Sequence, residues 1–435
     1  MTENTSEEYL NINDPLVVDE SVSEYRYEVY YPDNNKPLNQ NSQIPIHVTD
    51  QSGYFLPFKS FITIKGHFTQ SNGDDLADAN LITLTNNAPM FLFNQMEYLI
   101  GDTTIETIRF PGQASLMKGL LSYPKFFGEC GGLNMGWEND YDPEDLTKPD
   151  LTKKSGFKVR HDLYNKRNKG SCSFVIPLSH IFGFCEDYKK MLFGCRHTLN
   201  LHRCGDKNVL VKGSNTEPDC KFVITHLTWT IPRIIPNLST DISLTKIISN
   251  KFTSNIGFLH RQMDQIQVAS NSTYFKWQLG MKSTTEKPRY FIIGFQTNRD
   301  NNYNNAAIFD HCKLKTISVY LNATRYPNIE ITNNFPNGDY SVSYYLAKQF
   351  RENYYKLTEN YNDFGIPVDD YKKYYPLFVI DTNKQPDRLK DSISDIRIEA
   401  EFESNVPVNT ICYCLTLSDR ILKLVSDGSK MMVQY

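Results

Sequence analysis

Alternation of apolar and polar residues is the feature that most constrains the fold of this chain. In the segment SDIRIEAEFES (394–404), Ile396, Ile398, Ala400 and Phe402 alternate with charged residues. Because successive side chains of a β-strand point to opposite faces of its sheet, this segment predicts a strand with one buried and one wet face. A sheet with one wet face is typically antiparallel.

The same period of two recurs from about residue 60 to the C-terminus. RYFIIGF (289–295) is apolar on both faces and predicts a fully buried strand, while MEYLIGDTTIETI (96–108) predicts a hairpin that turns at Gly101-Asp102. Aromatic residues, 13% of the chain, favour strands. Two further segments are expected to place three residues each on a buried face: Ile62, Ile64 and Phe68 in FITIKGHF, and Val223, Leu227 and Trp229 in KFVITHLTWTI.

Helices are expected in two places. GQASLMKGLLSYP (112–124) puts Met117, Leu120 and Leu121 on one face and ends at Pro124. SVSYYLAKQFRENYYKL has a second apolar stripe, and no α/β alternation of the kind that builds a parallel sheet is visible. The sequence predicts an all-β protein with short helical insertions in loops. The residues of the second stripe are Tyr344, Ala347, Phe350, Tyr354 and Leu357.

The order of these elements occurs twice, about 200 residues apart, with almost no residue identity. This period is too long for a solenoid, whose repeats run about 20–50 residues, and it fits two complete domains. Prolines in PRIIPNLS (232–239) are expected to stop a strand, which puts the junction there. The predicted division is an acidic arm (1–25), a first domain (26–235) and a second domain (236–435). Three pairs of strands are expected to correspond: PLSHIF (177–182) with PLFVID (376–381), HTLNL (197–201) with IRIEAEF (396–402), and FVITHLTW (222–229) with TICYCLTL (410–417).

Charge and composition exclude several functions. The net charge is -4, and no Lys or Arg precedes Arg26, so the acidic N-terminal segment is expected to repel phosphates. That segment lacks the basic and apolar parts of a signal peptide, and no apolar run reaches the about 20 residues that span a bilayer. Nine scattered cysteines do not suggest a disulfide framework. We expect a soluble protein that is not secreted and binds no specific nucleic acid.

One segment, CRHTLNLHRC, is a metal-site candidate through Cys195, His197, His202 and Cys204. A tetrahedral zinc site needs all four ligands to converge. In a continuous strand the first two residues face one way and the last two the other, so a structural use is favoured.

Other reactive residues form no recognisable constellation. Cys412 and Cys414 are not a C-x-x-C redox pair, and His226, His260 and Cys312 have no triad context. The acidic strand face with Glu399, Glu401 and Glu403 is read as solvation. We therefore predict no catalytic, cofactor-binding or metal-binding residues, no cofactor and no enzymatic activity.

The densest basic stretch runs from Lys148 to Lys169. A solvated loop is the favoured interpretation, and a subunit contact or a nucleic-acid contact is the alternative. Its basic members are Lys148, Lys153, Lys154, Lys158, Arg160, Lys166, Arg167 and Lys169.

Several segments, in order, resemble the double jelly-roll major capsid proteins of Polinton-type and adintovirus-like DNA viruses and their invertebrate-genome copies. IPLSHIFGFCEDYKKMLFGCRHTLNLHR (176–203) carries the resemblance best. It extends over roughly residues 40 to 420. The other landmarks are FLPFKSFITIKG, LFNQMEYLIGD, SYPKFFGE, GWENDYDP, HLTWTIPRIIPN, GDYSVSYYLAKQF and YPLFVIDTN.

The resemblance implies two consecutive eight-stranded antiparallel jelly rolls and a structural role. Three copies would form a homotrimer with a pseudo-hexagonal outline, and these capsomers would tile an icosahedral shell in the virion. Neighbouring capsomers, penton proteins and minor capsid proteins would be the partners. Synthesis and assembly would occur in the host cytoplasm or nucleus.

Two other functions stay open from the sequence. The chain could be a minor capsid component or a host-domesticated copy that forms particles. It could also be a jelly-roll carbohydrate-binding protein or glycosidase, which paired carboxylates in an aromatic cleft would support.

Overall fold

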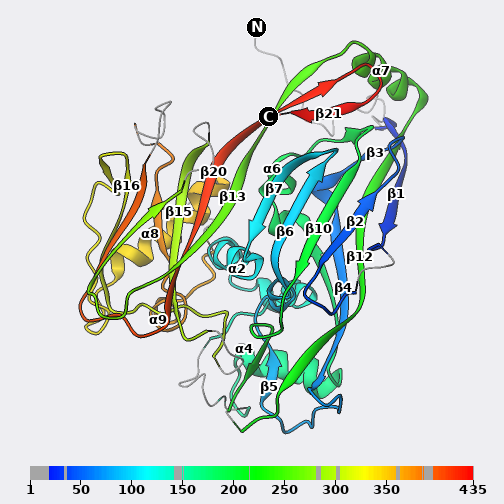
Figure 1. Cartoon of the computed structure of the whole chain (residues 1–435). Coiled ribbons are helices and arrows are strands. Elements are labelled where there is room, and N and C mark those ends of the chain that lie inside the picture. Colours follow the sequence, from blue (N-terminus) through cyan, green and yellow to red (C-terminus); the bar gives the residue numbers. More distant parts are fainter. Residues whose placement is uncertain are drawn as a thin grey trace, which may run out of the picture.

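The chain forms two β-sandwiches that lie side by side. The first along the sequence, roll 1, is on the right of Figure 1, and the second, roll 2, is on the left. The computed structural model describes residues 19–33, 37–141, 149, 151–214, 216–280, 286–299, 304–358, 363–384, 386 and 395–434. The first eighteen residues, most of the expected acidic arm, therefore lie outside the described residues.

Roll 1 consists of two antiparallel sheets that enclose an apolar core. One sheet has the order β8-β4-β12-β1, with the short strands β3 and β9 added beyond β12, and the other has the order β2-β10-β6-β7. The main strands are β1 (Val22–Tyr30), β2 (Gln43–Val48), β4 (Phe61–Gln70), β6 (Phe93–Ile100), β7 (Thr103–Arg109), β8 (Ser171–Pro177), β10 (His197–Arg203) and β12 (Cys220–Pro236). The short strands are β3 (Tyr54–Phe55), β5 (Ile82–Leu84), β9 (Leu192–Phe193) and β11 (Leu210–Lys212).

Roll 2 repeats this plan. Its sheets have the orders β18-β15-β20-β13 and β14-β19-β16-β17, and a final strand, β21 (Met431–Gln434), pairs with β20. The eight strands are β13 (Thr253–Gln267), β14 (Tyr274–Leu279), β15 (Lys287–Thr297), β16 (Leu314–Leu321), β17 (Thr324–Tyr326), β18 (Phe378–Asp381), β19 (Ile396–Phe402) and β20 (Thr410–Ser426).

The strand order is the same in both rolls. When the eight main strands of each roll are numbered along the chain, one sheet reads 6-3-8-1 and the other reads 2-7-4-5 in both rolls. This order is that of a jelly roll, so the predicted fold of two consecutive eight-stranded antiparallel jelly rolls is confirmed. β1 in roll 1 and β13 in roll 2 occupy equivalent places.

Helices lie in the connections between strands, as expected. None of those in the described parts of the chain is long and apolar enough to cross a membrane. Their bounds are η2 (Pro57–Lys59), α1 (Ala88–Phe91), α2 (Pro111–Ser122), α3 (Phe127–Cys130), η3 (Gly132–Met135), α4 (Gly156–Arg160), η4 (His161–Arg167), α5 (Leu178–Ile181), α6 (Gly183–Asp187), α7 (Leu238–Ser249), α8 (Ser341–Tyr355) and α9 (Val368–Lys373).

Most of the predicted patterns occur where the sequence put them. The alternating strand is β19, whose residues are alternately buried and half-buried, and the fully apolar strand is β15. β6 and β7 form the hairpin that turns at Gly101-Asp102. The helices expected before Pro124 and after Tyr340 are α2 and α8, although Leu357 lies beyond the end of α8.

Val223 is an exception, because it does not share the buried face of Leu227 and Trp229. A β-bulge between Ile224 and His226 shifts the register of β12 by one residue. Val223 is therefore half-buried, and Phe222 and Ile224 point into the core instead. A one-residue slip moves every following side chain to the other face.

Prolines mark the ends of two strands. β12 ends at Pro236, within the segment 232–239 where a strand was expected to stop, and inside the strand the carbonyl of Pro232 accepts a hydrogen bond from the Leu56 N–H at 2.9 Å. The strand expected at 177–182, however, is wrong. β8 ends at Pro177, and the residues after it form α5, so the true counterpart of β18 is the segment before the proline.

The basic stretch is largely helical rather than a loop. Its central part forms α4 and η4, while Lys148 lies outside the described residues. Lys154 and Lys169 are exposed and form salt bridges with Glu129 and Asp78. Arg160, by contrast, is completely buried, so the expectation of a solvated loop is wrong for this residue.

Candidate functional site

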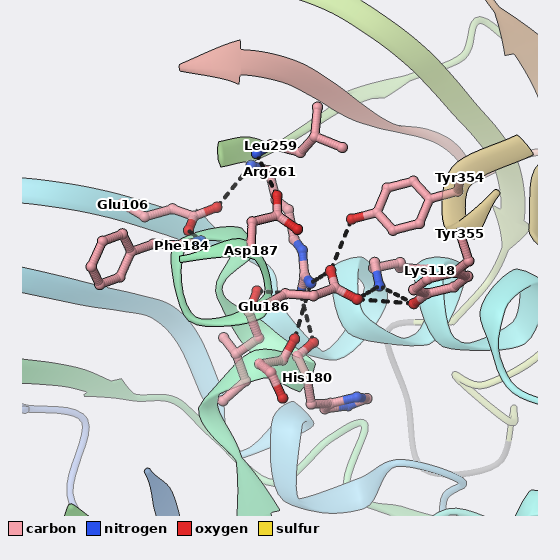
Figure 2. A network of polar contacts seen from close by, with 12 residues as sticks. Glu106, Lys118, His180, Phe184, Glu186, Asp187, Leu259, Arg261, Tyr354 and Tyr355 are labelled. Carbon is pink, nitrogen blue, oxygen red and sulfur yellow. Dashed lines mark hydrogen bonds and ion pairs between the residues drawn. The ribbon is translucent and has the colours of Figure 1, made fainter. Parts of the chain in front are cut away.

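Arg261 joins the two rolls in a buried polar junction (Figure 2). It extends from β13 of roll 2 to the α5–α6 segment of roll 1. Its Nη1 donates to the carbonyl oxygens of His180 and Ile181, both at 2.7 Å. Its Nη2 donates to the carbonyl of Ser179 at 3.0 Å and to Oε2 of Glu186 at 2.6 Å. One guanidinium thus fixes the turn between α5 and α6 against the neighbouring roll.

Glu186 is the centre of this junction. Its Oε1 accepts from Lys118 Nζ at 2.8 Å and from the Tyr355 hydroxyl at 2.9 Å, while Oε2 accepts from the Tyr354 hydroxyl at 2.8 Å as well as from Arg261. Burial alone would raise its pKa, but the charges of Lys118 and Arg261 hold the pKa well below the ordinary value. The carboxylate therefore stays ionised.

Two further carboxylates satisfy the open edge of β13. This strand pairs only with β20 among the described strands, so the other edge exposes backbone N–H groups toward roll 1. Asp187 accepts from the Leu259 N–H at 2.8 Å, and Glu106 accepts from the Arg261 N–H at 2.8 Å. The other oxygen of Glu106 accepts from the Phe184 N–H at 3.1 Å. Side chains of roll 1 thus replace a neighbouring strand.

Contacts on both sides extend this junction. The Nη1 of Arg420 donates to the carbonyl of Ile105 at 2.7 Å, and Arg420 Nε donates to Glu286 at 2.7 Å. At the loop end of the rolls, Asp140 accepts from Arg160 and from Asn305 of roll 2, both at 2.6 Å. The buried Arg160 therefore belongs to the contact between the rolls.

The C-terminal strand β21 also contacts roll 1. β21 extends from roll 2 past roll 1, and the thiol of Cys195 lies 3.1 Å from the carbonyl of Met431. The Thr103 hydroxyl donates to the carbonyl of Val433 at 3.0 Å. β21 therefore adds a further contact between the rolls, apart from the junction at Arg261.

A cavity of about 400 Å³ lies beside the junction, bordered by Lys118, Glu186 and Tyr355. These three side chains bind one another. His180, also in its wall, contacts the Tyr123 hydroxyl at 2.6 Å and Asn87 at 3.2 Å. Because these side chains are all paired within the protein, the arrangement supports a structural role for them.

A second cavity, of about 210 Å³, has aromatic residues and carboxylates in its wall. It is smaller than the roughly 300–1,000 Å³ typical of ligand sites. Asp140, one of its carboxylates, is held by Arg160 and Asn305. Glu138 is another carboxylate of this wall, and burial raises its pKa to about 6.

The four residues of the metal-site candidate do not converge. The Cys195 thiol contacts Met431, His197 contacts the Tyr98 hydroxyl at 2.9 Å, and the Cys204 thiol lies 3.4 Å from the carbonyl of Phe91. His202 is half-buried beside Glu97. Within the described residues there is no group of three or more His, Cys, Asp or Glu side chains that could hold a metal ion.

The other candidates are likewise dispersed. Cys412 and Cys414 are buried in β20, and burial raises the pKa of both thiols well above the ordinary value. His260 contacts Glu286 at 3.1 Å, and His226 lies beside the ring of Tyr31. Cys312 is near Thr297.

The acidic face of β19 carries ion pairs at the surface. Glu399 pairs with Arg397 at 2.9 Å, and Glu401 pairs with Lys315 at 3.1 Å. The backbone N–H of Glu403 donates to the Lys313 carbonyl. These contacts agree with the solvation that the sequence suggested for this face.

No sequence pattern predicted the junction. Its local signals were the segment GFCED, which forms α6, and the charged Arg261 inside the strand β13. Neither is a recognisable motif, and Glu186 and Arg261 lie 75 positions apart in the sequence, so their pairing is not visible there.

Two jelly rolls of the same strand order, fused through this junction, define a double jelly-roll protein. A family model described as "Double jelly roll-like domain" matches residues 82–422. The chain belongs to this double jelly roll-like domain family. No curated protein sequence matches it.

Solved structures with the same fold include viral capsid proteins. The Faustovirus major capsid protein is similar at a TM-score of 0.57 and 9% identity, over 96% of this chain and 94% of that chain. The Sputnik virophage structure gives 0.57 and 12%, over 99% and 92%. The mavirus major capsid protein gives 0.53 and 8%, over 100% and 94%. At these identities the likeness concerns the fold.

Proposed function

We propose that this chain is a major capsid protein, a structural subunit rather than an enzyme. One observation carries the proposal: the two rolls have the same strand order and lie side by side (Figure 1). The similarity of the fold to capsid proteins of Faustovirus, Sputnik and mavirus supports it.

Repetition of one contact explains how such a chain would assemble. Within the chain, the edge strand β7 and the helix α6 of roll 1 pack against β13 of roll 2. If roll 2 meets roll 1 of another copy in the same way, three chains place six rolls in a closed ring. A homotrimer with a pseudo-hexagonal outline is the result, and such capsomers can tile an icosahedral shell.

The finer assignments follow from the resemblance and belong to the proposal. They are a place in the virion of a Polinton-type or adintovirus-like virus, contact with neighbouring capsomers, penton and minor capsid proteins, and assembly in the host cytoplasm or nucleus. We also propose the domain division near residue 236, where α7 connects β12 to β13.

The mass of the purified protein in solution, followed by negative-stain imaging of the same sample, tests the proposal. We expect trimers with a hexagonal outline, or closed particles. A monomer that never assembles, at any protein concentration or ionic strength, would contradict it.

We further propose that the acidic arm docks onto a neighbouring subunit in the shell. Because β1 begins at Val22, the arm should be removed only as far as residue 18, which leaves the strand intact. The truncated protein should form trimers but assemble shells poorly. Normal shell assembly would show that the arm is dispensable.

A further inference from the structure

β1 is an edge strand with an exposed aromatic face. It pairs with β12 on one side, and no described strand pairs with its other edge. Tyr27 and Tyr31 are 61% and 62% exposed, and Val29 between them is 48% exposed. Tyr25 adds a further partly exposed ring. Four apolar residues at alternate positions of one unpaired edge form a surface that monomeric proteins seldom leave in water.

The equivalent strand in roll 2 is covered. β13 has the same place in its sheet, but roll 1 packs against it through β7 and α6. Phe258 of β13 stacks edge-on against Phe184 at 5.6 Å between ring centroids, and carboxylates of roll 1 accept from its N–H groups. One of the two equivalent strands therefore has its partner within the chain, while the other does not.

The arrangement in Figure 1 places β1 on the side of roll 1 that faces away from roll 2. At the opposite end of the molecule in Figure 1 lies β16, which belongs to the β14-β19-β16-β17 sheet of roll 2. The edge strand of that sheet, β17, corresponds to β7, the strand of roll 1 that packs against β13. The molecule thus has the uncovered strand β1 on one side. On the other side it has the sheet of roll 2 that contains the equivalent of β7.

We infer that the exposed face of β1 is the surface to which roll 2 of a second copy of this chain binds. The inference rests on the proposed function, which requires self-association, and it adds which surface makes the contact. The tyrosines supply large rigid contact areas, as aromatic residues do at interface centres. The β14-β19-β16-β17 side of the second copy supplies the opposing surface.

The test uses the full chain with Tyr27→Glu and Tyr31→Glu combined. Burial of two carboxylates without partners should weaken self-association on the order of 100-fold or more. The control is Val408→Glu, a residue in the β19–β20 loop that is 64% exposed and lies outside this face. Light scattering at matched concentrations should give a trimer for the wild type and the control, and a folded monomer for the double variant.

Hydrogen exchange on the wild type provides a second readout that needs no variant. The backbone amides of residues 25–31 should exchange more slowly in the trimer than in protein dissociated by dilution. A trimeric double variant, or equal exchange in the two states, overturns the inference and leaves the proposed function intact. A wild type that is monomeric at every concentration overturns both.

Discussion

Arg261 Nη2 lies 2.6 Å from Glu186 Oε2, and this ion pair joins roll 2 to roll 1 where the Arg261 side chain is almost fully buried and the Glu186 side chain is 17% exposed. The pair has further partners, since Lys118, Tyr354 and Tyr355 complete the carboxylate shell. A buried charge with this many partners stabilises the arrangement only while all of them are present.

Arg261→Met should therefore destabilise the protein strongly. The change leaves Glu186 with Lys118 as its only cation and leaves three carbonyls of the α5–α6 segment without a donor. We expect a loss of about 3–5 kcal/mol in the free energy of unfolding. Chemical denaturation measures it, with Arg26→Met as the control. Arg26 pairs with Glu24 at the surface, where solvent screens the pair and little change is expected. Equal effects of the two changes would contradict the role given to the junction.

Glu106→Gln tests the carboxylate that satisfies the edge of β13. Both oxygens of Glu106 accept backbone N–H groups, from Arg261 and Phe184. Glutamine has one acceptor oxygen, and its NH₂ group would face an N–H donor. We expect a loss of about 1–3 kcal/mol in the free energy of unfolding. Glu129→Gln, at an exposed salt bridge, is the matched control and should change little. A Glu106→Gln protein as stable as the wild type would show that the edge does not need two acceptors.

Acid should destabilise the protein through two buried histidines. Burial lowers the pKa of His180 to about 3, helped by the charges of Arg261 and Lys118, and burial lowers the pKa of His197 to about 3. Below pH 6.5, the ordinary pKa of histidine, the unfolded chain binds protons at these two residues, whereas the folded protein does not. Stability is therefore fully present above pH 6.5 and falls as the pH drops toward 3, by about 1.4 kcal/mol per pH unit for each histidine.

Glu138 acts in the opposite direction. Its pKa is raised by burial to about 6, so the folded protein gains stability from it as the pH falls from 6 to 4.5. The free energy of unfolding, measured from pH 7 to pH 4, should still decrease. In His197→Gln, the free energy of unfolding should fall less steeply with decreasing pH, because one group that takes up a proton on unfolding is absent. An unchanged slope in that variant would show that His197 is not the titrating group.

Local patterns predicted much of the fold and almost none of the junction. Alternation was enough for β19, because each side chain there has either the core or water as its environment. It failed at Val223, since a β-bulge is not visible in a pattern of polarity. A proline does end β12, at Pro236, but the apolar residues after Pro177 form the helix α5 and not the expected strand.

The contacts between the rolls depend on distant segments. Glu106, Glu186 and Arg261 lie in three separate elements, and only the packing of roll 1 against roll 2 brings them together. The same reason explains why Arg160 was assigned to a solvated loop. Its partners Leu84 and Asp140 are remote in the sequence, and they bury a charge that the local pattern places in water.

Gly183 lies close against β13 of roll 2, and Gly183→Ala should disturb this contact. A Cβ at this position would overlap the Leu259 carbonyl oxygen, a backbone atom of β13 that cannot move aside without moving the strand. We expect a loss of about 1–3 kcal/mol in the free energy of unfolding, together with faster proteolysis between the rolls. Gly205→Ala is the control, because a Cβ there meets no atom within 4 Å. Because the contact between α6 and β13 holds the two rolls of one chain against each other, and the proposed capsomer needs both rolls in this arrangement, the Gly183 variant should also assemble more slowly than the Gly205 variant. Equal stability and equal assembly of the two variants would show that this close approach is not required.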